Sequence, residues 1–264
     1  MRMAGISGSG DRLESSSLLG VPVHLADLDQ VLQNVESWIQ QRDRCHWIYH
    51  ANSHGIMEAH KRAEFMEVLK SADLSLVDGK VTNWFVSRRV SRAVPHVRAA
   101  DLLLGFCRIA NSKGYTNFFY GDTEEVLSLM SEKLLQQFPA LKIVGAYSPP
   151  FRELATEEDA QITAMINQAN PDVLWVGLGL PKQENWIFAH LGKLEVPVIA
   201  AVGVSFRFIC GKADPPPRWL SNAGLEWLWR VLHEPRRLWH RAFVNGPQFI
   251  GLSLLELSGL KKFK

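Results

Sequence analysis

The sequence predicts an α/β protein in which a doubly wound, mostly parallel sheet carries helices on both faces and is followed by a C-terminal helical appendage. Apolar segments of strand length alternate with longer amphipathic segments from residue 45 to residue 203, and parallel strands need helical crossovers of that kind. The alternation ends at three consecutive prolines, residues 215–217, which neither continue a helix nor pair inside a sheet. These two observations carry the prediction of the fold class.

Each expected element follows from its own pattern. Runs of apolar, β-branched and aromatic residues predict strands, and they cover residues 45–52, 74–79, 116–121, 141–147, 172–179 and 196–203. Apolar residues that recur with a period of about 3.6 residues predict helices, and these cover residues 55–72, 98–114, 123–139, 156–170 and 181–194. Beyond the prolines, residues 219–243 are expected to be helical, with an interruption at Pro235.

Composition divides the chain into three expected parts. Residues 1–18 are rich in Gly, Ser and charge, lack the apolar run of a secretory signal, and are expected to be a disordered leader. Residues 19–210 form the α/β domain, and residues 211–264 form the appendage. No run of 18 consecutive apolar residues occurs, so no membrane-spanning helix is expected. The three widely spaced cysteines suggest reduced thiols in the cytoplasm and argue against a zinc knuckle.

Charge is distributed unevenly. From Arg207 onward the chain has ten Lys and Arg against four Asp and Glu, a net charge of +6, which leaves −4 for the rest. Four of the nine tryptophans also lie beyond residue 218. A basic, Trp-rich segment suits nucleic acid or an anionic membrane surface, although these tryptophans would equally serve as core residues packed on the body. A nucleic-acid-binding protein is one alternative function, which the acidic body disfavours.

The carboxyl ends of the expected strands carry the candidate site residues, because ligands of open parallel sheets bind there. His50 and Asn52 end the first strand, and Asp78 and Gly79 end the next. Small residues at these ends let a ligand approach the backbone, and helix N-termini offer N–H groups to a diphosphate. A second alternative function, an NAD-linked oxidoreductase, is disfavoured because no G-x-G-x-x-G follows the early strand. Later strand ends supply Gly121, Asp122, Gly177, Gly179, Lys182, Gln183 and Glu184.

Two charged features have two interpretations each. Asp78 either caps backbone N–H groups in a turn or acts as a general base. Arg98 either forms a charge pair with Asp101 at a helix N-terminus or faces a leaving diphosphate.

The histidines do not predict a metal site. His46 and His50 share one strand face, whereas His54 lies past the turn and His60 lies inside the following helix. No HExxH-type spacing accompanies them, so no metal is expected. Position 50 is at the right end of its strand for contact with a substrate.

Five ordered segments, residues 50–57, 74–79, 176–187, 201–206 and 216–239, resemble the WecG/TagA/CpsF glycosyltransferase family. The resemblance implies a Rossmann-like, nucleotide-sugar-binding catalytic domain over residues 19–210. It also implies an inverting transferase that moves a sugar from a UDP-sugar to a polyprenyl-diphosphate-linked acceptor in cell-surface polysaccharide synthesis. Such an enzyme needs no cofactor beside its UDP-sugar substrate. It is expected to be cytoplasmic and peripheral on the inner face of the cell membrane; a homo-oligomer is left open, and no nucleic-acid partner is expected.

The resemblance also assigns roles to residues. Asp78 matches the catalytic base, Asn52 an early substrate contact, Arg98 an active-site arginine and Gln183 a contact in the nucleotide pocket. His50 joins the expected catalytic group. The remaining expected substrate contacts are Gly79, Asp101, Gly121, Gly177, Gly179, Lys182, Glu184, Gly203, Ser205 and Phe206. Arginines of the appendage are expected to complete the site at the membrane, and the candidates are Arg218, Arg230, Arg237 and Arg241.

The chain departs from the family pattern at three positions near the expected sugar pocket. His50 stands where the family usually has Thr, and Ser205 and Arg207 stand where Ala and Asp are usual. The donor therefore need not be UDP-N-acetylmannosamine. A related sugar or the uronic acid is an alternative, because a carboxylate on the donor would suit Arg207 and a cationic His50.

Overall fold

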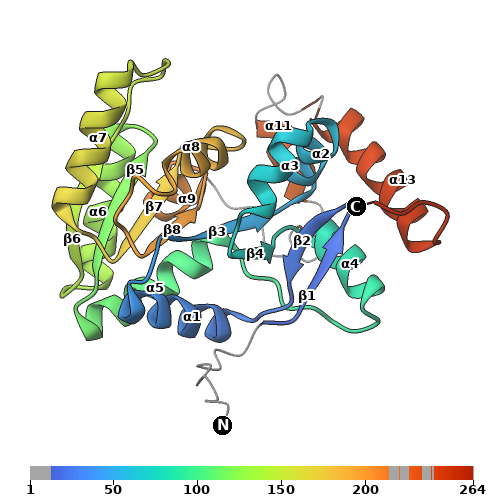
Figure 1. Ribbon diagram of the computed structural model, residues 1–264, viewed down its shortest axis with the longest axis horizontal. Helices are drawn as coiled ribbons and strands as arrows, with labels where there is room; N and C mark the ends of the chain where they lie inside the picture. The colour runs from blue at the N-terminus through green and yellow to red at the C-terminus, as the bar shows by residue number, and fades with distance from the viewer. Residues whose placement is uncertain (1–12, 214–219, 221–225, 234–238, 240, 264) are drawn as a thin grey trace, which may run out of the picture.

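The computed structural model describes residues 13–213, 220, 226–233, 239 and 241–263. Its centre is a twisted sheet covered by helices on both faces (Figure 1), so the predicted doubly wound α/β fold is confirmed. Within the described residues, no helix combines the length and the apolar character that crossing a bilayer would require.

The sheet has eight strands in the order β1-β2-β4-β3-β8-β7-β5-β6. β1 pairs antiparallel with β2, and the other neighbouring strands are parallel. The strands are β1 Ser15–Leu18, β2 Val21–His24, β3 His46–Ala51, β4 Leu74–Val77, β5 Thr116–Gly121, β6 Lys142–Tyr147, β7 Val173–Gly177 and β8 Val198–Ala201.

The helices build one apolar cluster on each face of the sheet. One cluster includes α1 Leu28–Gln41, α5 Ala99–Lys113, α6 Glu124–Gln137 and α9 Ser205–Cys210. The other includes α2 Ser53–Lys61, α3 Ala63–Lys70, α4 Lys80–Arg89, α7 Thr156–Ala169, α8 Lys182–His190 and α13 Gly246–Leu257. The described part of the chain before α13 contains α11 Glu226–His233 and the π-helical turn η1 Arg241–Asn245.

β3 lies where the winding of the sheet reverses. The strand that follows β3 in the chain, β4, lies on one side of it, and the last strand, β8, lies on the other. The chain leaves β3 into α2 on one face of the sheet and leaves β8 into α9 on the other. Departures to opposite faces from neighbouring strands open a crevice at their carboxyl ends, which is where doubly wound proteins bind ligands. The topology therefore places the candidate site at the ends of β3, β4, β7 and β8.

Two expected boundaries are wrong. The leader predicted over residues 1–18 is too long, because Ser15–Leu18 form β1, closed onto β2 by a tight turn in which Leu19 and Gly20 have φ of 51° and 83°. The single helix predicted over residues 55–72 is two helices. Arg62 lies between them and has extended backbone angles, φ −133° and ψ 108°, which end one helix before the next begins. The apolar side chains of both helices still face the sheet.

The C-terminal helix α13 belongs to the core of the body, although residues 211–264 were expected to form an appendage. Phe249 is buried and contacts Phe85 of α4 edge to face, with ring centroids 5.7 Å apart. The carboxylate of Glu256 accepts a hydrogen bond from the Leu19 backbone N–H at 3.0 Å and pairs with Arg89 at 3.1 Å. These contacts join the end of the chain to the first strands and to α4.

We expect Phe249→Ala to destabilise the whole body. Phe249 is 1% exposed, whereas its neighbour Ile250 is 43% exposed. Removing a buried phenylalanine leaves a cavity and costs about 3 to 5 kcal/mol, whereas Ile250→Ala should cost less than about 1 kcal/mol. Urea unfolding followed by tryptophan fluorescence measures both. Equal stability of the two variants would show that α13 is a separable appendage.

Candidate active site at the carboxyl ends of the strands

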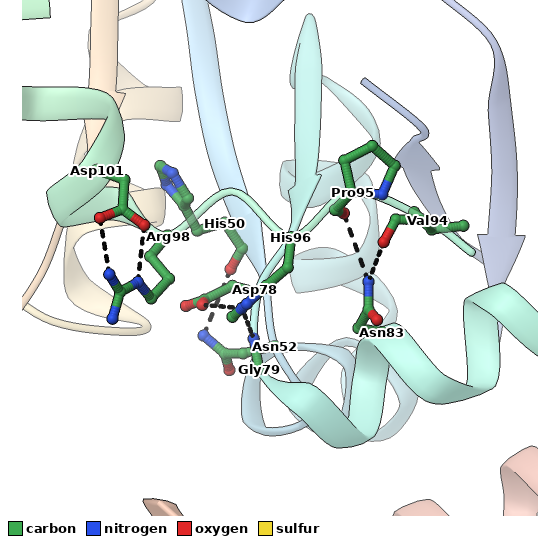
Figure 2. A network of polar contacts seen from close by, with 10 residues as sticks. All are labelled: His50, Asn52, Asp78, Gly79, Asn83, Val94, Pro95, His96, Arg98 and Asp101. Atoms are coloured by element: carbon green, nitrogen blue, oxygen red, sulfur yellow. Dashed lines mark hydrogen bonds and ion pairs between the residues drawn. The ribbon is translucent and has the colours of Figure 1, made fainter. Parts of the chain in front are cut away.

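The ladder between β3 and β4 places Asp78 at the edge of the sheet. Ala51 pairs with Val77 as the last residues of the two strands, and the Asp78 backbone N–H donates to Ala51 O at 2.9 Å, one residue beyond β4. Gly79 then has φ of +83°, a conformation that side chains disfavour, and it turns the chain into α4. Asp78 is thus fixed between the end of a strand and the beginning of a helix (Figure 2).

His96 contacts both residues of this turn, although no sequence pattern indicated it as a site residue. Its Nε2 lies 3.3 Å from Asp78 Oδ1 and 2.9 Å from the Gly79 backbone nitrogen. Figure 2 shows the imidazole directly against the Asp78 carboxylate. The side chain of Asp78 is 30% exposed, so the carboxylate is held from one side and reaches solvent on the other.

A clamp from α4 holds the segment that carries His96. Asn83 Nδ2 donates to Val94 O at 2.8 Å and approaches Pro95 O at 3.4 Å. The backbone N–H of Val94 donates to Ser87 Oγ at 3.1 Å. Figure 2 shows Asn83 against the carbonyls of Val94 and Pro95. Together with Ser87 it fixes the irregular chain just before His96.

His50 faces Asp78 from β3, and its burial keeps the imidazole neutral. Its side chain is buried, and Nδ1 lies 3.0 Å from Ala201 O, so Nδ1 carries the hydrogen and donates it to that carbonyl. Burial lowers the pKa of His50, and the negative charge of Asp78 offsets only part of this effect. The cationic His50 that would suit a uronic acid donor is therefore disfavoured.

Asp78 is ionised at neutral pH. Burial opposes ionisation of the carboxyl, but the hydrogen bonds with His96 and with the Gly79 backbone N–H, together with the electrostatic effect of the neighbouring imidazoles, outweigh burial, so that the pKa of Asp78 lies below its ordinary value. A carboxylate that is ionised and partly exposed is able to accept a proton from a bound hydroxyl.

Asn52 and Arg98 are both engaged within the chain. Asn52 Oδ1 caps α2 by accepting the Gly55 N–H at 3.0 Å. Arg98 pairs with Asp101 through two hydrogen bonds of 2.7 and 2.8 Å at the N-terminus of α5. The charge pair considered from the sequence is thus present, and a role for Arg98 at a diphosphate would have to share the guanidinium with Asp101.

The glycines at the strand ends divide into two groups. A Cβ on Gly121 would lie 2.5 Å from the Gly177 carbonyl carbon, and a Cβ on Gly177 would lie 2.5 Å from the Phe206 ring. These two glycines therefore serve the close packing of β5, β7 and the buried Phe206, which has no exposed surface with which to contact a ligand. Gly179 has open space around it, and Gly203 lies beside the Gln183 side chain.

Gln183 and Glu184 form a buried polar unit in the first turn of α8. Gln183 Oε1 accepts the Gly179 N–H at 3.1 Å, and its Nε2 donates to Glu184 Oε1 at 2.8 Å. Burial raises the pKa of the Glu184 carboxyl to about 7. Lys182 is exposed, whereas Ser205 is buried. Gln183 thus supports the Gly179 backbone where the site is open.

Arg207 is neutralised by Asp122. The guanidinium binds both carboxylate oxygens, with Nε to Oδ2 at 2.8 Å and Nη2 to Oδ1 at 2.9 Å. Asp122 is almost fully buried at the end of β5. Neither Arg207 nor His50 therefore offers an unpaired positive charge to the carboxylate of a uronic acid donor.

The expected appendage arginines cannot be placed. Arg218 and Arg237 lie outside the described residues, as do the side chains of Arg230 and Arg241.

In the part of the chain that the structure describes, no three His, Cys, Asp or Glu side chains converge as metal ligands would. A metal-free reaction stays a prediction.

Comparison with known proteins identifies the relatives of this chain. The model of the glycosyl transferase WecG/TagA/CpsF family matches residues 16–262. The chain is 27% identical over 203 residues to the N-acetylglucosaminyldiphosphoundecaprenol N-acetyl-beta-D-mannosaminyltransferase of Bacillus subtilis (strain 168), covering 77% of each chain. Proteins of the same name are 27% identical in Bacillus spizizenii, over 85% of each chain, and 25% identical in Staphylococcus aureus (strain MW2), over 84% of this chain and 85% of the relative.

We expect Glu184→Gln to stabilise the protein at alkaline pH. The pKa of the Glu184 carboxyl rises on folding from an ordinary 4.5 to about 7. The folded state is therefore least penalised below pH 4.5, and the free energy of unfolding falls as the pH rises from 4.5 to about 7. The cost of ionising it in the folded protein is on the order of 3 kcal/mol above pH 7. Urea unfolding of the variant and of wild type should therefore differ more at pH 8 than at pH 5.

Glu158→Gln is the control. Its carboxyl pairs with Arg152 on the surface, and its pKa is lowered to about 2, so this substitution should change stability almost equally at pH 5 and pH 8. A pH-independent effect of Glu184→Gln would show that Glu184 is ionised in the folded protein.

Proposed function

This chain belongs to the WecG/TagA/CpsF family of glycosyl transferases, and from that premise we propose that it moves a sugar from a UDP-sugar to a polyprenyl-diphosphate-linked acceptor, with inversion at the anomeric carbon. The observation that carries the proposal is the ionised Asp78 carboxylate at the crevice beside β3. Family membership leaves the nucleic-acid-binding and oxidoreductase hypotheses without support.

In the proposed reaction Asp78 is the general base. The hydroxyl of the acceptor gives its proton to the carboxylate as its oxygen attacks the anomeric carbon, and the bond from that carbon to the diphosphate breaks with its electron pair leaving on UDP. A positioned base contributes roughly 10² to 10⁴ to the rate of such a step. The His96 contact and the Gly79 turn fix the direction of the carboxylate before any substrate binds. The entropy cost of orienting the base is therefore not part of the activation barrier.

The donor is proposed to bind across the ends of β7 and β8. The backbone at Gly179 is open, and Gln183 holds it from below. α8 and α4 begin at this edge of the sheet, and the free N–H groups of a helix N-terminus favour phosphate. Since His50 is neutral and Arg207 is paired, a donor without a carboxylate fits the described charges better than a uronic acid does.

The acceptor is proposed from the relatives. Their printed names describe transfer to N-acetylglucosaminyldiphosphoundecaprenol, a sugar on a lipid diphosphate. The C-terminal part of this chain has exposed apolar side chains, which suit contact with the membrane holding such a lipid. Those described are Leu232, Trp239, Phe243, Ile250, Leu254, Leu255 and Leu260.

The function is tested by incubating the protein with vesicles that contain polyprenyl-diphosphate-linked N-acetylglucosamine and with one UDP-sugar at a time. UDP-N-acetylmannosamine, its uronic acid and UDP-N-acetylglucosamine make up the first panel. Transfer from one donor with release of UDP is the expected result. Absence of transfer from every UDP-sugar would overturn the proposal.

Asp78→Asn should lower turnover by roughly 10² to 10⁴ while the dissociation constant for UDP changes less than about twofold. The amide keeps the size of the side chain and an oxygen acceptor but takes up no proton. Turnover is measured in the vesicle assay and UDP binding by calorimetry. Asp101→Asn, which breaks the surface pair with Arg98, is the comparison. Near-normal turnover in Asp78→Asn would assign the carboxylate to the turn alone.

The double variant Ile250→Gln, Leu254→Gln should bind anionic vesicles at least about tenfold more weakly than wild type, because each buried aliphatic side chain contributes about 1.5 to 3 kcal/mol. Both side chains are exposed on one face of α13. The matched control is Leu135→Gln, Met165→Gln on α6 and α7, whose side chains are similarly exposed. Sedimentation with phosphatidylglycerol vesicles decides the point, and equal loss in both double variants would contradict membrane contact through α13.

A further inference from the structure

One nitrogen atom, His96 Nε2, meets two groups with opposite requirements. The Gly79 backbone N–H at 2.9 Å can only donate, and the Asp78 carboxylate at 3.3 Å can only accept. Without a hydrogen Nε2 accepts from Gly79, and with a hydrogen it donates to Asp78. The position of a single proton therefore decides which of the two hydrogen bonds is made (Figure 2).

We propose that Asp78 and His96 share one exchangeable proton, and that His96 is the positioning residue that takes up, through Asp78, the proton released by the acceptor hydroxyl. This inference rests on the proposed function, in which Asp78 is the base. It adds a second titratable group to the reaction centre, on a segment outside the strands and helices.

The proton balance has three steps. The acceptor O–H bond breaks, its electron pair forms the bond to the anomeric carbon, and the proton joins the Asp78 carboxylate. The new carboxylic acid then turns its O–H toward His96 Nε2, whose lone pair takes the proton. Asp78 is again a carboxylate, His96 is an imidazolium that donates to it, and the Gly79 N–H is released. His96 is partly exposed, so that water removes the proton after the products leave.

The other charged groups around the pair are already engaged. His50 faces Asp78 from β3, but it donates through Nδ1 to Ala201 O, and burial lowers its pKa. Arg98 and Asp101 of α5 are bound to each other. Lys80, the first residue of α4, is exposed. Among the described residues, His96 is the titratable side chain that is hydrogen-bonded to the Asp78 carboxylate, and the Gly79 backbone N–H is a second partner.

The clamp from Asn83 supports this role. A proton moves between two groups only when their separation is held near hydrogen-bond distance, and irregular segments are ordinarily the most mobile part of a fold. Asn83 and Ser87 bind the backbone of the two residues that precede His96. A residue that only fills space would not require its backbone to be held by α4, the helix that follows Gly79.

His96→Gln tests the proposal. The glutamine side chain still accepts the Gly79 N–H but takes up no proton. We expect kcat to fall roughly tenfold or more, and the acid limb of the pH profile of kcat/KM to move to lower pH, because a carboxyl alone is then left to take up the proton. An acid limb at the wild-type position would overturn the proposal and leave Asp78 as a lone base.

His24→Gln is the matched control. His24 also accepts a backbone N–H, from Ser75 at 3.0 Å, but it lies on β2 and contacts no carboxylate in the described hydrogen bonds. The glutamine side chain can still accept this N–H, and the substitution should not move the acid limb. The same shift in both variants would count against the proposal.

A second measurement does not depend on activity or on the folding of His96→Gln. Nitrogen-15 NMR of histidine-labelled protein follows protonation of His96 Nε2 in wild type and in Asp78→Asn. Loss of the carboxylate should leave Nε2 only as an acceptor of the Gly79 N–H, so its nitrogen-15 shift at a fixed pH should move toward that of an imidazole nitrogen without a hydrogen. An unchanged shift would overturn the shared proton, whereas normal turnover of Asp78→Asn with a changed shift would overturn the proposed base and leave the pair intact.

Discussion

The backbone hydrogen bond from Asp78 to Ala51 is the contact on which the candidate site depends. It extends the ladder of β3 and β4 by one residue, so the carboxylate leaves the sheet at its edge instead of within a strand. Gly79 then turns the chain at a φ that side chains disfavour, and α4 starts immediately. α4 in turn carries Asn83, which places His96 against the same carboxylate. One register thus determines the positions of the base, its partner and the helix between them.

Most polar side chains of the site are satisfied by backbone groups or by each other. His50 donates to Ala201, Asn52 caps α2, Gln183 holds Gly179, and Asp122 neutralises Arg207. Such prior engagement keeps the polar groups of a site in place at the moment of reaction. Asp101 is bound by Arg98, whereas the Asp78 carboxylate is partly exposed and has no cationic Lys or Arg partner in the described ion pairs. Negative charge with access to solvent is what a base acting on a bound hydroxyl needs.

The C-terminal helix connects the apolar surface of the chain to this site. Phe249 and Glu256 on its inner side enter the core and the β1–β2 turn, while Ile250 and Leu254 on its outer side are exposed. α13 packs on α2 and α4, the two helices that begin at the ends of β3 and β4. A lipid surface bound to the outer side would therefore be one helix away from α2 and α4, which carry the site.

The sequence by itself determined the alternation of strands and helices, the strand ends that meet at the crevice, and the selection of Asp78 and Gln183. These features are local, because a strand and the turn after it are read from consecutive residues. Sequence patterns also favoured Arg98, yet its closest charge, Asp101, is only three residues away and binds it. The same patterns did not distinguish Phe249, which is in the core, from Ile250, which is at the surface.

Only the tertiary structure decided that His96 belongs to the site. It lies 18 residues beyond Asp78, in a segment without periodicity, and its position depends on one amide side chain of α4 that binds two backbone carbonyls. The neutral state of His50 was decided in the same way, because its burial comes from β3 lying between β4 and β8. Local sequence encodes the turn of the chain, whereas contacts between distant segments set the distances and the burial that give a side chain its charge.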